Sequence, residues 1–149
     1  RITCHLYSAV AGVAMANDTF TLDIERFVRK AKGNMDLVVR KVALDLFRRV
    51  IMKSPVDTGR FKGNWQVAIG SIPGGTLEVD DKAGTATISR VTATTLNLKA
   101  GDVINLVNNL QYARALEYGY SKQAPAGMVR LSVMEYSAVV TKAAGEVNK

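Results

Sequence analysis

The sequence predicts an α+β fold with a long N-terminal helix, an antiparallel sheet of about four strands, a short helix and a C-terminal helix. Three observations support this order. Apolar residues recur at helical spacing before Lys53, residues 64–107 alternate or are rich in β-branched side chains, and helical spacing returns after residue 129. A chain of 149 residues suffices for one domain with its own core. We expect that domain over residues 18–149, after an N-terminal extension or arm over residues 1–17.

The long helix is expected to begin at Asp18 or Thr21, whose side chains can cap a helix start. Its end is expected near Lys53, because Pro55 pushes Ser54 out of the helical conformation. Between these limits, apolar side chains at spacings of three and four residues form one helical face. This face consists of Ile24, Phe27, Val28, Ala31, Met35, Val38, Val39, Val42, Leu46 and Val50.

A second apolar stripe lies on the opposite side of the same helix. Leu37, Leu44 and Ile51 repeat every seven residues, and the basic side chains of Arg40 and Arg48 lie between them. A surface helix needs one apolar face, so a helix with two is either packed internally or contacts another subunit. Both alternatives stay open at this point. These five residues are our candidates for an intersubunit contact.

The middle of the chain has the composition of strands. They are expected at residues 64–69, 76–79, 85–95 and 103–107, with a loop at 71–75 and a turn at 80–84. In the first strand Trp65, Val67 and Ile69 fall on one side, and Trp65 is expected to anchor the core. Residues 85–95 are assigned to a strand because they are rich in threonine and β-branched side chains.

The last third of the chain returns to helical patterns. A short helix is expected over residues 112–118, and Gly119 is expected to end it. After a loop that contains Pro125 and Gly127, a C-terminal helix is expected over residues 129–146.

Few residues of the chain could carry catalysis or bind a metal. Cys4 is its one cysteine and His5 its one histidine, which leaves no internal disulfide, no serine–histidine triad and no multi-histidine zinc site. Glu117 beside Arg114 is the best isolated acid, but one acid makes no mechanism, and an ion pair or a helix contact explains it. The sequence therefore predicts neither an enzyme nor a cofactor or metal site.

The segment after Pro55 has the residues of a turn rather than of a phosphate loop. A phosphate loop needs several glycines and a lysine that opens a helix, and this order is missing here. We expect Asp57 or Thr58 to bond back to the turn. Gly59 is expected to adopt a conformation that other residues resist.

The net charge of +7 suits proximity to DNA, because basic side chains displace counterions from phosphates. A surface that is simply basic explains the charge equally well. No stacking platform of aromatic and basic residues and no recognition-helix signature stands out. The arginines and lysines between Arg26 and Lys53 make a small basic nucleic-acid-binding module the alternative function. No apolar run reaches the roughly 18 to 20 residues of a membrane-spanning helix, so no membrane partner is expected.

The N-terminal segment allows two interpretations. Residues 6–16 are apolar and small, and Ala14-Met15-Ala16 is similar to a signal-peptide cleavage site. However, Arg1 alone supplies positive charge before this run. We therefore expect a retained arm that packs on a neighbouring subunit rather than a signal peptide that is removed.

Two segments resemble the signatures of a family of long-tailed bacteriophage neck and tail-completion proteins. The first is Ser-Pro-Val-Asp-Thr-Gly-Arg-Phe-Lys-Gly-Asn-Trp at residues 54–65, and the second is Asn-Asn-Leu-Gln-Tyr-Ala-Arg-Ala-Leu-Glu-Tyr-Gly at residues 108–119. The loop at 123–129 also fits, and the resemblance extends over residues 22–140. The residues that carry the match are Pro55, Asp57, Thr58, Gly59, Trp65, Tyr112, Ala113, Glu117 and Gly119.

This resemblance implies a structural virion protein of the phage head–tail junction that forms a homo-oligomeric ring, with six subunits expected. Its neighbours would be head-closure or connector proteins on one side and tail terminator or tube proteins on the other. Viral DNA would pass through the ring without sequence-specific contact. The protein would reside in the host cytoplasm during assembly and then in the virion. Closed rings use a contact between two different patches of the subunit.

Overall fold

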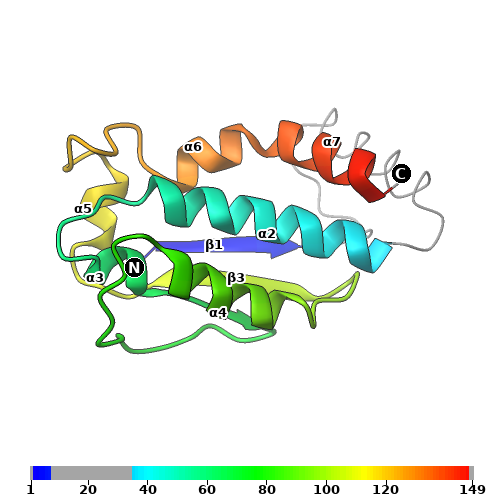
Figure 1. Cartoon of the computed structure of the whole chain (residues 1–149), viewed down its shortest axis with the longest axis horizontal. Coiled ribbons are helices and arrows are strands. Elements are labelled where there is room, and N and C mark those ends of the chain that lie inside the picture. The colour runs from blue at the N-terminus through cyan, green and yellow to red at the C-terminus, as the bar shows by residue number, and fades with distance from the viewer. Residues whose placement is uncertain (1, 8–34, 148–149) are drawn as a thin grey trace.

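The computed structural model describes residues 2–7 and 35–147, and it confirms the α+β class (Figure 1). The elements in chain order are β1 (Ile2–Tyr7), α2 (Met35–Lys53), α3 (Arg60–Gly63), β2 (Trp65–Ile69), α4 (Thr85–Thr95), β3 (Val103–Asn108), α5 (Ala113–Glu117), α6 (Val129–Met134) and α7 (Tyr136–Val147). The expected start of the long helix at Asp18 or Thr21 lies outside the described residues.

The described strands form a three-stranded antiparallel sheet in the order β1-β3-β2, with β3 in the centre. Trp65 of β2 lies opposite Asn108 of β3, and Ile69 lies opposite Ile104. On the other side of β3, the backbone of β1 pairs from Ile2 opposite Asn108 to Tyr7 opposite Val103. Residues 2–7, which we expected in an N-terminal extension or arm over residues 1–17, thus pair within the sheet of their own chain. Their pairing partner lies about a hundred residues away, so the local sequence contains no sign of it.

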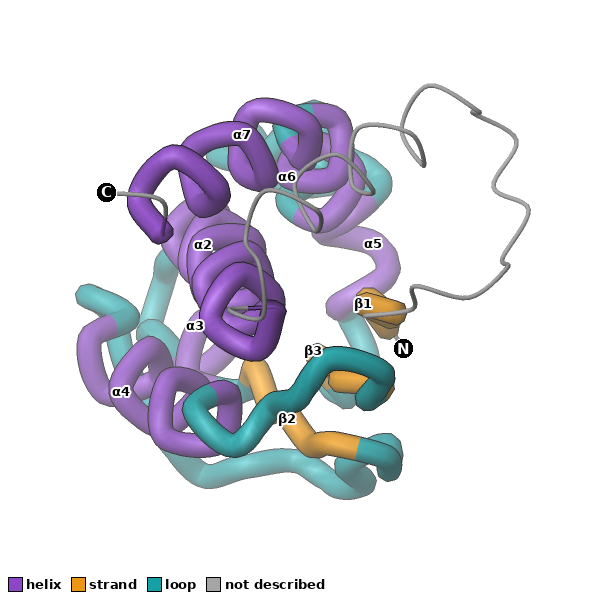
Figure 2. The backbone as a smooth tube through the Cα atoms, turned by 90° about the vertical axis from the view of Figure 1, so that its right-hand side faces the viewer, coloured by secondary structure: helices purple, strands orange, loops and turns teal. Residues whose placement is uncertain are grey.

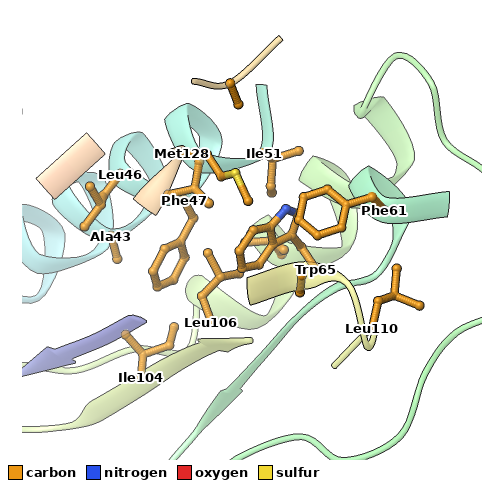
Figure 3. Packing of buried hydrophobic residues seen from close by; sticks show 14 of the residues in the cluster. Ala43, Leu46, Phe47, Ile51, Phe61, Trp65, Ile104, Leu106, Leu110 and Met128 are labelled. Carbon is orange, nitrogen blue, oxygen red and sulfur yellow. The ribbon is translucent and has the colours of Figure 1, made fainter. Parts of the chain in front are cut away.

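Three helical segments cover one face of this sheet. Figure 2 shows α2 between α7 and α4, with the strands to one side of them, and α2 contacts both helices. The core lies between these helices and the sheet, and Trp65 and Phe47 are its largest fully buried side chains (Figure 3). Other members are Ala43, Leu46, Val50, Ile51, Phe61, Val91, Leu98, Ile104, Leu106, Leu110, Ala113, Ala124 and Met128.

The predicted apolar face of the long helix is confirmed for four residues of α2, and its part before Met35 lies outside the described residues. Val38, Val42, Leu46 and Val50 are all buried, as their spacing of four residues requires. The helix ends at Lys53 as expected, and the amide of Ser54 closes its last turn on the carbonyl of Ile51 at 3.2 Å. The expected strand at 103–107 is also confirmed as β3, and the short helix at 112–118 as α5.

Residues 85–95 form helix α4, so the prediction of a strand there was wrong. The carboxylate of Asp81 accepts hydrogen bonds from the amides of Gly84 and Thr87 at 2.9 and 2.8 Å, which satisfies donors at the helix start. Thr87, Val91 and Thr95 repeat every four residues and are buried against the core side. Burial at helical spacing and the cap from Asp81 thus overrode the β-propensity of the threonines.

Residues 76–79 are not a strand either. The side chain of Asn64 donates to the carbonyl of Leu77 at 3.0 Å and accepts from its amide at 2.7 Å. A side chain thus holds this segment beside the start of β2, in place of the backbone ladder of a strand. The expected C-terminal helix is interrupted at Glu135, which separates α6 from α7. Of the four expected strands, the structure shows two, to which β1 adds a third.

Candidate interaction surface

The second apolar stripe of α2 does not form one continuous surface. Ile51 is 0% exposed and belongs to the core, whereas Leu37 is 47% exposed and Leu44 is partly buried. A repeat of seven residues drifts by about 20° per heptad around a straight helix, so the three side chains do not share one environment. The Gly84 turn also covers this end of α2, because a Cβ on Gly84 would lie 3.3 Å from Ile51 Cγ2.

The basic residues of the stripe divide in the same way. Arg40 donates from Nε to the carbonyl of Leu98 at 2.6 Å, which joins α2 to the end of α4. Arg48 is exposed. Ile51 was therefore wrongly included among the intersubunit candidates, since internal packing explains it. Leu37 and Arg48 remain on the surface.

The first signature segment is used to hold the core together. Trp65 is fully buried, as predicted, and its indole N–H donates to Ser54 Oγ at 2.8 Å. Ser54 Oγ in turn donates to the carbonyl of Val50 at 2.8 Å, so the end of α2 is tied to the start of β2. Every buried polar side-chain atom of the described residues has a partner.

The turn before Trp65 has the predicted backbone role. Gly59 has φ +95°, and a Cβ there would lie 2.5 Å from the amide nitrogen of Lys82. The carbonyl of Gly59 accepts from the amide of Asp81 at 3.0 Å, and Thr58 Oγ1 accepts from the amide of Arg60 at 3.2 Å. Pro55 is buried and Asp57 is exposed. The segment therefore brings the α2–α3 connection against the α4 cap.

Glu117, in the second signature segment, caps helix α6 from outside it. The buried carboxylate accepts from the amides of Met128 and Val129 at 3.0 Å each, and from the amide of Arg130 at 2.8 Å. Arg130 also lies 3.4 Å from Glu117 Oε1 through Nε and donates to the Glu117 carbonyl at 2.7 Å. Of the two explanations left open for Glu117, an ion pair is present, but with Arg130 and not with the neighbouring Arg114, and both carboxylate oxygens are engaged. Such a carboxylate is a structural cap and not a free acid.

Next to this buried cap lies an exposed aromatic group. Tyr118 is 64% exposed, and the guanidinium carbons of Arg114 and Arg130 lie 5.8 and 4.8 Å from its ring centroid. We call Arg114, Tyr118 and Arg130 the tyrosine–arginine cluster. Tyr120, two residues on, is 85% exposed.

The cluster is held in place by its surroundings. Arg130 is fixed by Glu117, as described above. Gly119, which follows Tyr118, has φ +90°, and a Cβ there would lie 2.6 Å from the carbonyl oxygen of Pro125. The prediction that Gly119 ends the short helix is confirmed, and its conformation also fixes the direction of the chain between Tyr118 and Tyr120.

The other residues of the second signature lie around the start of α5. Ala113 is fully buried in the core. The Tyr112 ring is tilted against Phe61 with centroids 6.1 Å apart, and it remains partly exposed. Both residues help to dock α5, which in turn presents Arg114 and Tyr118 on the surface.

The sequence analysis found no combined aromatic and basic platform, and the cluster corrects that. Arg114 and Tyr118 are four residues apart on one helical turn, a spacing that could have indicated a contact. Arg130 comes from another helix. The capping of α6 by Glu117 brings it to Tyr118, and no local pattern predicts this.

Two further carboxylates, those of Glu135 and Asp81, stabilise the packing of the helices. Glu135 accepts from Lys53 Nζ at 2.6 Å and from Arg49 at 2.8 Å, and these contacts hold the pKa of its carboxyl below the ordinary value. Burial acts to raise the pKa of Asp81. The hydrogen bonds from Thr87 and Gly84 and the charge of Lys62 outweigh burial and leave that pKa lowered.

Among the residues whose side chains the structure describes, no three His, Cys, Asp or Glu side chains come together as a metal site would require. The described helices include none with the length and apolar character to cross a bilayer. No family model matches the chain, and neither a curated protein nor a solved structure matches it.

Proposed function

We propose that this chain is a structural virion protein of the phage head–tail junction, a subunit of a ring that joins the connector to the tail and lets DNA pass. The two signature segments support the family, and the tyrosine–arginine cluster is the observation that carries the assembly role. The signature residues other than Asp57 and Tyr112 are buried or bonded within the fold. Beside them lies the exposed ring of Tyr118 in contact with two arginines, of which Arg130 is held by Glu117.

Tyrosine and arginine are the residues that most often carry the binding energy of protein interfaces. A tyrosine loses little conformational entropy on binding, and the guanidinium of Arg130 is already held by Glu117. The Arg130 side chain, which is held before binding, suits a contact that is repeated between neighbouring subunits around a ring. In a closed ring this patch meets a different patch of the next subunit. Leu37 and Arg48, on α2, are candidates for the complementary patch.

The proposal is tested in the phage that encodes the chain. Deletion of the gene is expected to leave heads and tails unjoined, as counted by electron microscopy of lysates. Normal numbers of joined, infectious particles after deletion would rule the role out. Complementation with Tyr118→Ala is expected to restore joining poorly, and Leu96→Ala, which removes another exposed apolar side chain, is the matched control.

A small nucleic-acid-binding module is the second candidate function, and the same cluster favours it. Aromatic rings beside arginines provide stacking surfaces for unpaired bases, worth about 1 to 3 kcal/mol per base. The overall charge of +7 would add a salt-dependent attraction to phosphates. A mobility-shift assay with single-stranded DNA at low salt tests it. Binding that weakens with salt and with Tyr118→Ala would support this function, and no binding at low salt would remove it.

A further inference from the structure

An open groove lies on another part of the surface, between the end of α2 and the loop before α6. Its volume is about 360 Å³. Met52 and Val56 line one side, and Pro125 and Leu131 line the other. This volume is at the lower end of the range for sites that bind small molecules or short peptide segments.

The two sides of the groove are joined by a paired amide contact. The amide of Val56 donates to Gln123 Oε1 at 2.9 Å, and Gln123 Nε2 donates to the carbonyl of Val56 at 3.0 Å. Gln123 thereby holds the loop against the segment that follows α2. The groove is consequently formed before any partner arrives.

Lys62 is the unusual residue of this groove. It is 5% exposed, yet its ammonium makes no hydrogen bond and no ion pair within the described part of the chain. Because no buried side-chain nitrogen there lacks a partner, this ammonium must reach solvent, and Lys62 does line the groove. Its stem lies close to the Gly84 turn, since a Cβ on Gly84 would lie 3.0 Å from Lys62 Cδ.

No carboxylate of the described residues forms an ion pair with the Lys62 ammonium. Asp81 is near enough for the charge of Lys62 to help lower its pKa, but the Asp81 oxygens accept their hydrogen bonds from Gly84 and Thr87. Lys53, the other cation of the groove, is bound to Glu135 outside the lining. The lining itself contains two lysines and no carboxylate.

We infer that the groove binds a short peptide segment of a neighbouring protein that carries one carboxylate between apolar side chains. The carboxylate would accept from the Lys62 ammonium, and the flanking side chains would lie against Met52, Val56 and Leu131. Charge complementarity selects an acidic occupant, and the apolar sides select one with apolar neighbours to its acid. This site is separate from the tyrosine–arginine cluster, and the inference goes beyond the proposed junction role.

The test uses the full chain and two labelled peptides, acetyl-Ala-Val-Glu-Val-Ala-amide and the same peptide with Gln in place of Glu. Fluorescence anisotropy gives the dissociation constants at low salt, and amide chemical shifts locate the site. The Glu peptide is expected to bind about tenfold more tightly than the Gln peptide, because a charge-assisted hydrogen bond is lost. It should shift the amides of Lys62, Ala126 and Gly127, which line the groove.

Lys62→Gln is expected to remove this preference for Glu, whereas Lys142→Gln, an equal charge change on exposed α7, is expected to keep it. Equal affinity for the two peptides on the unaltered chain would overturn the inference, even if Lys62→Gln failed to fold. Shifts confined to residues outside the groove would overturn it as well. Neither result depends on phage assembly, so this inference can fail while the junction role stands.

Discussion

Two buried carboxylates cap helices in this protein, and they differ in what they connect. Asp81 bonds to Gly84 and Thr87, three and six residues ahead of it, and so starts the helix that follows directly. Glu117 bonds to the amides of residues 128–130, more than ten residues away, and to the side chain of Arg130. Asp81 stabilises one element. Glu117 couples the core to an exposed cluster.

This difference shows how a buried cap can position side chains on the surface. Arg130 approaches Tyr118 because the start of α6 is anchored to Glu117, and Gly119 and Gly127 leave no room for a side chain at that junction. A change at Glu117 should therefore alter both stability and the surface, whereas a change at Asp81 should alter stability alone. The following predictions test that contrast.

The largest expected effect is that of Glu117→Ala. It removes the acceptor of three amides and the partner of Arg130, and we expect the free energy of unfolding to fall by about 3 kcal/mol. Urea denaturation measures it. Glu78→Ala removes an exposed glutamate that pairs with Arg60 and serves as the control, with an expected change below about 1 kcal/mol. If both substitutions cost the same, Glu117 is not the cap described here.

Asp81→Ala is expected to cost about 2 kcal/mol, because the first turn of α4 loses its cap and Thr87 Oγ1 loses its acceptor. Asp80→Ala, one residue earlier and exposed, is the matched control. Particle joining should not respond to Asp81→Ala beyond the loss of folded protein. A loss of joining larger than the loss of folded protein would contradict the proposed difference between Asp81 and Glu117.

Acid should weaken the protein through Asp81 and Glu135. Both have a folded-state pKa below the ordinary values of 3.8 and 4.5, so both bind protons more readily when the chain is unfolded. Their stabilisation is present above those values and is lost as the pH falls through the lowered folded-state pKa. The midpoint of urea unfolding, followed from pH 6 downward, should fall less steeply in Asp81→Asn and Glu135→Gln than in the unaltered chain. Equal slopes would contradict the assignment.

The smallest expected effect on stability is that of Tyr118→Ala. The ring is largely exposed, so the free energy of unfolding should change by less than about 0.5 kcal/mol. Particle joining should nevertheless fall, which would show that Tyr118 contributes to assembly and not to stability. A variant that unfolds as readily as Glu117→Ala would show that Tyr118 supports the fold.

Local sequence patterns were enough to predict several of the helices and strands. The end of α2 follows from Pro55, β2 and β3 from alternation and apolar runs, and the stop of α5 from Gly119. In each case the deciding interaction lies within a few residues, in the allowed backbone angles or in the spacing of buried side chains. The anchoring role of Trp65 follows from the same kind of information.

The tertiary structure decided the rest. Residues 85–95 form helix α4 because Asp81 caps its first turn and its buried side chains recur at helical spacing against the core. Residues 2–7 form a strand because they pair with the edge of β3 that β2 leaves unpaired. Ile51 is buried by the Gly84 turn, and Arg130 reaches Tyr118 through Glu117. Apart from the Asp81 cap, each of these outcomes depends on contacts between residues far apart in the chain. The free energy of such contacts exceeds the small local propensities, and nothing in the neighbouring residues of a single sequence records it.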